Sequence, residues 1–170
     1  MSFCTWLLVH LLVCPAVAQR FSRALYPSAY KIKRGKYSPL DPTFQRSQKD
    51  VDLLFEILLA GTQIEGGDGR LLVPDEELAS LKQVKKLEVI CEDVLPKTLS
   101  EVRRLVAQLS QRGAPQRGAP LRWDDYQSTV LTLVYISQTA ARLDSEPSQQ
   151  AWGDVLIQLF NALHKDLTVD

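Results

Sequence analysis

Cysteine and histidine are scarce in this chain, which has three cysteines and two histidines among 170 residues. Only Cys91 and His164 lie beyond the first 18 residues. A single cysteine excludes an intramolecular disulfide there, and one cysteine with one histidine is too few ligands for a metal site. We therefore expect no metal, no cofactor and no catalytic residue, and a fold whose stability comes from packing.

Each of these two residues leaves an alternative open. Cys91 lies on the apolar side of an expected helix, which favours a buried thiol over a free, reactive thiol or an intermolecular disulfide. His164 lies beside Lys165 near the C-terminal end of the last expected helix, where cations interact favourably with the helix dipole. The alternative for His164 is a catalytic role with surface carboxylates, which requires a partner within hydrogen-bond reach.

Neither sign of charge is in excess, because 20 basic and 20 acidic residues give a formal net charge of zero. This balance argues against binding to nucleic acid through the whole surface. The chain also lacks an Asn-X-Ser/Thr sequence, because its single asparagine, Asn161, is followed by alanine and leucine. N-glycosylation is therefore excluded.

Residues 1–18 have the pattern of a secretory signal peptide. A short apolar run is followed by a proline and by two small residues that flank a valine, which predicts cleavage between Ala18 and Gln19. A membrane span needs about 20 predominantly apolar residues, and this run is shorter. We expect a secreted protein with no stable membrane span.

Residues 19–46 show no helical or strand period and are expected to form an extended, flexible basic arm. Its central cations are Lys31, Lys33, Arg34 and Lys36. This cluster could bind a polyanion such as a sulfated glycan, or an acidic extracellular protein. Two alternatives stay open: Lys33–Arg34 is a dibasic processing site, or the arm is a solvated tail with no dedicated partner.

Residues 47–168 are expected to form a single helical domain. Its first helix follows Ser47, which makes a capping-box pattern with Asp50, and it ends at Gly61. Apolar residues at helical spacing predict the buried face, which comprises Val51, Leu54, Phe55, Leu58 and Leu59. Since Leu53 and Ile57 are apolar too, we expect this helix to lie centrally in the core.

The next part of the domain contains one uncertain segment and two helices. Residues 62–73 include a glycine cluster and predict either a short hairpin or a loop. A helical stretch runs from Pro74 to Leu95, with a break near residues 81–83 left open. Thr98 begins another helix in a capping-box pattern, and the buried face of this helix comprises Val102, Leu105, Val106 and Leu109.

Residues 111–121 contain two copies of Gln-Arg-Gly-Ala-Pro and predict an exposed loop. A fourth helix is expected over 123–142, with Tyr126, Val130, Leu133, Val134, Ser137 and Ala141 on one side. A fifth begins near Ser148, with Trp152, Val155, Leu156, Leu159, Phe160, Leu163 and Leu167 on its apolar side. These patterns predict an all-α fold, a compact four- or five-helix bundle after a cleaved signal peptide and a flexible basic arm.

Four co-linear runs resemble one small vertebrate family, the family with sequence similarity 180. They are DVDLLFEILLA at 50–60, DEELASL at 75–81, STVLTLVY at 128–135 and LFNALHKDL at 159–167. The resemblance covers most of the region from Phe44 to Leu167. It implies a secreted protein and brings no activity, ligand or receptor, so no functional residue is carried over from it.

The sequence favours a secreted, non-enzymatic helical protein, monomeric, that binds an extracellular protein or a sulfated glycan. A cytokine-like signalling ligand is a variant of this hypothesis, suggested by size, helicity and secretion, and such fold-level analogy is a weak argument. An enzyme that uses His164 and surface carboxylates is the alternative from another class.

Overall fold

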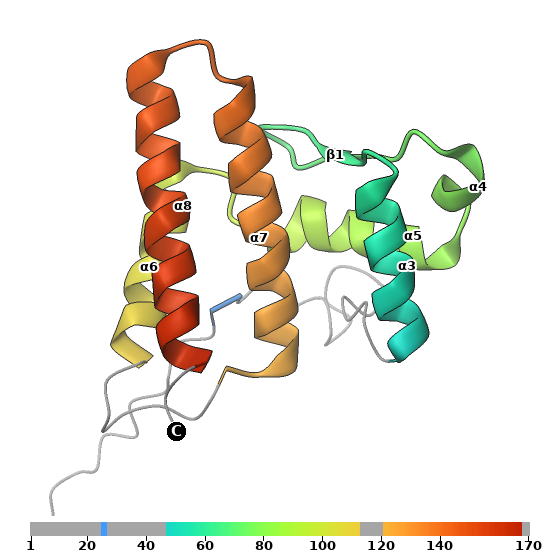
Figure 1. Ribbon diagram of the computed structural model, residues 1–170, viewed down its shortest axis with the longest axis horizontal. Helices are drawn as coiled ribbons and strands as arrows, with labels where there is room; N and C mark the ends of the chain where they lie inside the picture. The colour runs from blue at the N-terminus through green and yellow to red at the C-terminus, as the bar shows by residue number, and fades with distance from the viewer. Residues whose placement is uncertain (1–24, 27–46, 113–120, 168–170) are drawn as a thin grey trace, which may run out of the picture.

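A bundle of three long helices forms one side of the molecule (Figure 1). The computed structural model describes residues 25–26, 47–112 and 121–167. The three helices are α6 (Leu99–Arg112), α7 (Trp123–Arg142) and α8 (Glu146–Leu167). α8 packs along both α6 and α7. The prediction of an all-α bundle is confirmed.

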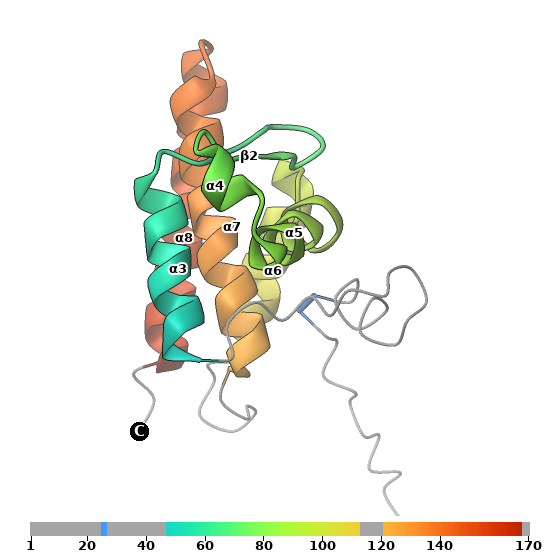
Figure 2. The ribbon, with the colours of Figure 1, turned by 90° about the vertical axis from the view of Figure 1, so that its right-hand side faces the viewer.

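A second group of elements packs on the other side of α7 (Figure 1). It comprises α3 (Gln48–Leu59), β1 (Gln63–Ile64), β2 (Leu71–Leu72), α4 (Glu76–Ala79), α5 (Lys82–Val89) and the π-helix η1 (Ile90–Val94). Figure 2 looks at the molecule from this side and shows α3 and α5 to either side of α7. Because α7 contacts β1, η1 and α8, it is the element that joins the two groups.

Both capping boxes expected from the sequence are formed. At the start of α3 the backbone N–H of Asp50 donates to Ser47 Oγ (3.3 Å), and the N–H of Ser47 donates to the Asp50 carboxylate (3.1 Å). At the start of α6 the N–H of Glu101 donates to Thr98 Oγ1 (3.3 Å), and the N–H of Thr98 donates to the Glu101 carboxylate (3.1 Å). These bonds satisfy donors that the first helical turn leaves without an intrahelical partner.

The helical stretch after Pro74 is divided, so the break that the sequence left open is present. α4 ends at Ala79, and α5 begins at Lys82. The final turn then widens into η1, in which the N–H of Leu95 donates to the carbonyl oxygen of Ile90 (3.1 Å). This five-residue spacing is that of a π-helix, which the apolar pattern did not predict.

The glycine-rich segment forms the short hairpin, in which Ile64 pairs with Leu71. α7 covers the outer edge of β1 with two side chains. Gln138 accepts from the N–H of Ile64 (2.8 Å) and donates to the carbonyl oxygen of Thr62 (3.0 Å), while Arg142 donates to the carbonyl oxygen of Ile64 (2.6 Å). These side chains replace the hydrogen bonds that a third strand would make, so this edge is not left open.

The prediction that α3 lies centrally in the core is wrong. The helix lies at the periphery (Figure 1), and its buried residues are Leu54 and Ile57. Phe55 and Leu59, which were expected on the buried face, are 63% and 71% exposed. Because α3 has apolar residues around most of its circumference, their periodicity does not show which side of the helix packs on the core.

The buried side of α7 differs from the side that the apolar pattern indicates. The buried residues of this helix are Asp125, Gln127, Ser128, Thr129, Leu131, Thr132, Tyr135 and Ile136. The expected face remains half-buried or exposed, and it comprises Tyr126, Val130, Leu133, Val134, Ser137 and Ala141. The helix therefore turns a largely polar side inward, where Thr129 and Thr132 donate to carbonyl oxygens of their own helix.

The other two faces were predicted more accurately. Every residue of the expected α6 face is buried. On α8, Val155, Leu159 and Leu163 are buried, but Phe160 and Leu167 are exposed. α8 begins at Glu146, slightly before the expected Ser148.

Candidate functional site

Two residues far from the helices in sequence, Leu25 and Tyr26, are buried in the core. Tyr26 is only 2% exposed, and its hydroxyl lies 3.0 Å from Thr129 Oγ1 and 3.3 Å from Thr132 Oγ1. The phenol therefore reaches the polar side of α7. Both residues fall in the segment that was expected to form an extended arm, and the sequence does not predict this contact because a single buried dipeptide leaves no periodic signal.

The direction of these hydrogen bonds follows from where the two threonine hydroxyl protons point. Thr129 donates its own hydroxyl proton to the carbonyl oxygen of Asp125, and Thr132 donates its proton to that of Ser128, each at 2.7 Å. Both threonine oxygens are therefore acceptors toward Tyr26, whose one proton they share. Burial raises the pKa of the Tyr26 hydroxyl above its ordinary value, although the threonine bonds oppose this shift, so the phenol stays protonated.

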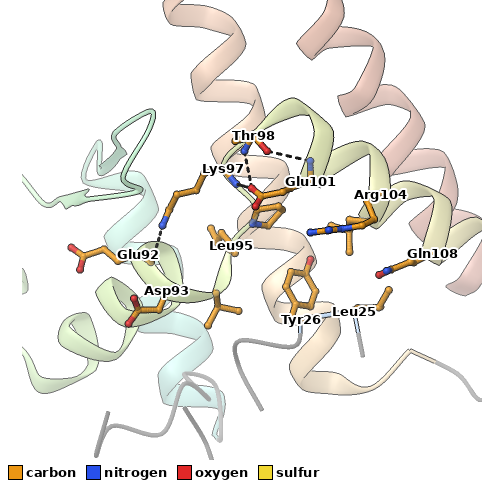
Figure 3. A pocket seen from close by; sticks show the side chains of 13 residues that line it. Leu25, Tyr26, Glu92, Asp93, Leu95, Lys97, Thr98, Glu101, Arg104 and Gln108 are labelled. Carbon is orange, nitrogen blue, oxygen red and sulfur yellow. Dashed lines mark hydrogen bonds between the residues drawn. The ribbon is translucent and has the colours of Figure 1, made fainter. Parts of the chain in front are cut away.

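Leu25 and Tyr26 also form one wall of a cavity of about 630 Å³ (Figure 3). Its other walls come from η1, from the turn after it and from α6. The remaining lining residues are Glu92, Asp93, Val94, Leu95, Pro96, Lys97, Thr98, Glu101, Arg104, Leu105 and Gln108. This volume falls in the range of about 300–1,000 Å³ that is typical of small-ligand sites.

The carboxylate of Glu101 lines this cavity and caps the start of α6. It accepts hydrogen bonds from the backbone N–H groups of Lys97 (3.0 Å) and Thr98 (3.1 Å) (Figure 3). These bonds, the one from Lys97 first, hold the pKa of Glu101 below its usual value despite partial desolvation. Glu101 is thus an ionised cap of α6 rather than a proton donor.

Lys97 is likewise bound to the surrounding backbone. Its ammonium group donates to the carbonyl oxygen of Glu92, as Figure 3 shows. Its own carbonyl oxygen accepts from the hydroxyl of Tyr135 at 3.1 Å. Arg104 also lines the cavity, from the exposed side of α6.

Cys91 lies in η1 with none of its surface exposed. Burial raises the pKa of its thiol to about 12, so the thiol is protonated at neutral pH. Since the thiolate is the reactive form, Cys91 behaves as a small apolar core residue. This agrees with the burial expected from its position on the apolar side of a helix.

His164 lies on the exposed surface of α8, next to Lys165 in the last turn. Its ring stacks on Phe160, with centroids 6.4 Å apart. Cys91, by contrast, is enclosed in the core. Among the described residues, no three His, Cys, Asp or Glu side chains gather where they could hold a metal ion.

The exposed side of α8 carries a row of large apolar residues. Ile157, Phe160 and Leu167 are 61%, 57% and 59% exposed. Spacings of three and seven residues put them on one side of the helix, with the His164 ring between the last two. Phe160 and Leu167 continue the apolar period of the helix, so the sequence places them on its apolar side.

The remaining predicted site residues lie outside the described part of the chain. They are the basic cluster Lys31, Lys33, Arg34 and Lys36 and the expected cleavage position between Ala18 and Gln19. In the described part, no helix is both long enough and apolar enough to span a membrane.

The sequence model of the FAM180 family matches residues 25–167. The chain belongs to the FAM180 family. The matched region of this FAM180 protein begins at Leu25 and ends at Leu167, the last residue of α8. The family region therefore includes the Leu25–Tyr26 dipeptide that is buried against α7. No solved structure matches the chain.

Proposed function

We propose that this FAM180 protein is a secreted, non-enzymatic helical factor that acts by binding another extracellular protein through the exposed side of α8. The observation that carries this proposal is the row formed by Ile157, Phe160 and Leu167. Large apolar side chains that gather on one exposed surface are typical of interaction sites, whereas isolated ones are common everywhere. Aromatic residues are also enriched in such interfaces.

Secretion is supported by the signal-peptide pattern at residues 1–18. The helical body is suited to the extracellular environment because its stability needs no disulfide, and the thiol of Cys91 is enclosed. The basic cluster from Lys31 to Lys36 adds a second means of attachment, to sulfated glycans at the cell surface. A cytokine-like ligand is the form of this proposal in which the partner is a receptor.

A binding role is favoured over catalysis because the polar groups near the cavity make hydrogen bonds that stabilise the fold. Glu101 caps α6, Lys97 binds the carbonyl oxygen of Glu92, and the Tyr26 hydroxyl is held by two threonines. These groups are used to hold the fold, whereas general acid–base catalysis needs groups whose pKa lies near the working pH. His164, the alternative catalytic residue, is exposed on α8.

The first test expresses the full chain in mammalian cells and analyses the culture medium by mass spectrometry. We expect a protein that begins at Gln19, because cleavage after Ala18 removes the signal peptide. A chain that stays inside the cells and still begins with Met1 would contradict secretion.

The second test measures saturable binding of the purified, fluorescent protein to intact cells. The variant Ile157→Glu/Phe160→Glu should lose at least about ten-fold in affinity, since charges in the apolar centre of an interface are unfavourable. Gln158→Glu is the control, because it adds a charge at an exposed polar position of the same helix. Equal binding by both variants would exclude this side of α8 as the contact surface.

A further inference from the structure

The contact between Leu25–Tyr26 and the helical body resembles that of a bound ligand. Twenty residues of chain, 27–46, separate Tyr26 from Ser47, the cap of the first described helix. Tyr26 nevertheless has almost no exposed surface and makes hydrogen bonds only to residues of α7 among those described. Tyr26 thus belongs to the core although it lies outside the described helices in the sequence.

The surface that receives Tyr26 is polar and already ordered. The Thr129 and Thr132 hydroxyls are fixed by bonds to carbonyl oxygens of their own helix, which leaves both oxygens available as acceptors. A helix side turned into an ordinary core would carry aliphatic residues. Two fixed acceptors beside the cavity favour an occupant whose side chain ends in a hydroxyl donor.

The described residues only partly fill the space around the dipeptide. The cavity of about 630 Å³ has Leu25 and Tyr26 on one wall and apolar groups of Leu95 and Leu105 on others. Arg104 and Gln108 lie at its α6 side (Figure 3). Considering only the described residues, this volume is large enough for further side chains of a peptide.

We propose that the cleft lined by η1 and α6, next to Thr129 and Thr132 of α7, is a binding site for a peptide segment with a tyrosine, and that Leu25–Tyr26 occupies it from within the same chain. The phenol hydroxyl supplies the donor for Thr129 and Thr132, and the preceding leucine fills the apolar part. A tethered occupant has an effective concentration on the order of millimolar, so an external segment binds only when the internal one is weakened or leaves. This site is separate from the exposed side of α8 and does not depend on secretion.

The experiment uses the full chain with Tyr26→Ala and the blocked peptide acetyl-Ala-Leu-Tyr-Pro-amide, which has the sequence of residues 24–27. Isothermal titration calorimetry should show binding to Tyr26→Ala at least about ten-fold tighter than to the unmodified chain, where the tethered tyrosine competes. The same peptide with phenylalanine in place of tyrosine should bind about five-fold more weakly, since it lacks one hydrogen bond.

A third variant locates the peptide. Adding Thr129→Val and Thr132→Val to Tyr26→Ala removes both acceptors at nearly constant volume. The tyrosine and phenylalanine peptides should then bind equally. A five-fold preference that survives these changes would overturn the proposal, because the peptide would be bound elsewhere.

If Tyr26→Ala does not fold, a second variant, Leu25→Ala, tests the proposal. Leu25→Ala keeps the tyrosine but weakens the internal occupant, and the peptide should bind it at least about ten-fold tighter than the unmodified chain. If a folded variant binds the peptide no better than the unmodified chain does, the cleft is simply part of the core and the proposal is wrong.

Discussion

Replacing Gly69 by alanine tests how closely the hairpin turn packs on η1. Gly69 is buried and has a φ of +78°. A Cβ at this position would lie closer than 3.0 Å to the carbonyl oxygen of Cys91, which is backbone, and to the flexible end of Lys97. Gly61 is the matched control, because its φ is +82° and a Cβ there would have no atom within 4 Å.

The two substitutions share one cost and differ in another. A non-glycine residue in the left-handed region loses roughly 1–2 kcal/mol, which applies to both positions. Overpacking against a fixed group adds about 1–3 kcal/mol, which applies to Gly69 alone. We therefore expect the free energy of unfolding to fall by about 2–5 kcal/mol for Gly69→Ala and by about 1–2 kcal/mol for Gly61→Ala.

Urea denaturation of both variants measures these losses through the fluorescence of Trp123 and Trp152. The slope of the free energy against urea concentration should stay unchanged, so that the midpoints report stability. If Gly69→Ala loses no more stability than Gly61→Ala, the close approach of the turn to the Cys91 carbonyl does not exist in solution.

Four further predictions follow from single contacts. Gly153→Ala should raise the free energy of unfolding by about 0.5–1 kcal/mol, because Gly153 lies inside α8 with no atom within 4 Å of an added Cβ; a loss in urea denaturation would contradict this. Tyr135→Phe should lower it by about 1–2 kcal/mol, because the carbonyl oxygen of Lys97 then loses a buried donor; unchanged stability would show that water replaces the hydroxyl. Since the folded-state pKa of Glu101 is lowered, its contribution is present above the unfolded-state pKa of about 4.3 and disappears as the pH falls through the folded-state value. The stability difference between the unmodified chain and Glu101→Gln should therefore shrink in acid, and a constant difference from pH 7 to pH 3 would contradict the assignment. Cys91 should react with a thiol reagent only after unfolding, and non-reducing electrophoresis should show a monomer; rapid reaction of the folded protein or a reducible dimer would contradict its burial.

Helix boundaries were predictable from the sequence because local chemistry determines them. The pairs Ser47–Asp50 and Thr98–Glu101 can each form a capping box within one turn, and the structure contains both. Gly61 and Pro96 likewise lie where helical structure has ended. These signals require no knowledge of the tertiary fold.

The inward sides of α3 and α7 were not predictable in the same way. Thr129 and Thr132 are polar, so a pattern based on hydrophobicity assigns them to solvent. Both are buried, and Tyr26, roughly a hundred positions away in the sequence, supplies the donor for them. The inward position of this polar side of α7 therefore becomes evident only from its tertiary contact with Tyr26.

The candidate surface on α8 was missed for the opposite reason. Phe160 and Leu167 continue an apolar helical period, which is the usual pattern of a core. α8 packs on α6 and α7 from one direction only, so the apolar sector is wider than the contact and its edge remains exposed. Cys91 was predictable because its apolar neighbours lie on the same side of the helical stretch.

The burial of Leu25 and Tyr26 changes what a cut at Lys33–Arg34 would do. The dibasic pair lies between this dipeptide and the first described helix, so a cut there would divide the family region itself. Cys91 is the one cysteine in the described residues, so no disulfide between described residues holds the two pieces together. The product would be a two-chain complex whose integrity depends on concentration. At low protein concentration, mass action would favour loss of the short chain and leave the cleft empty.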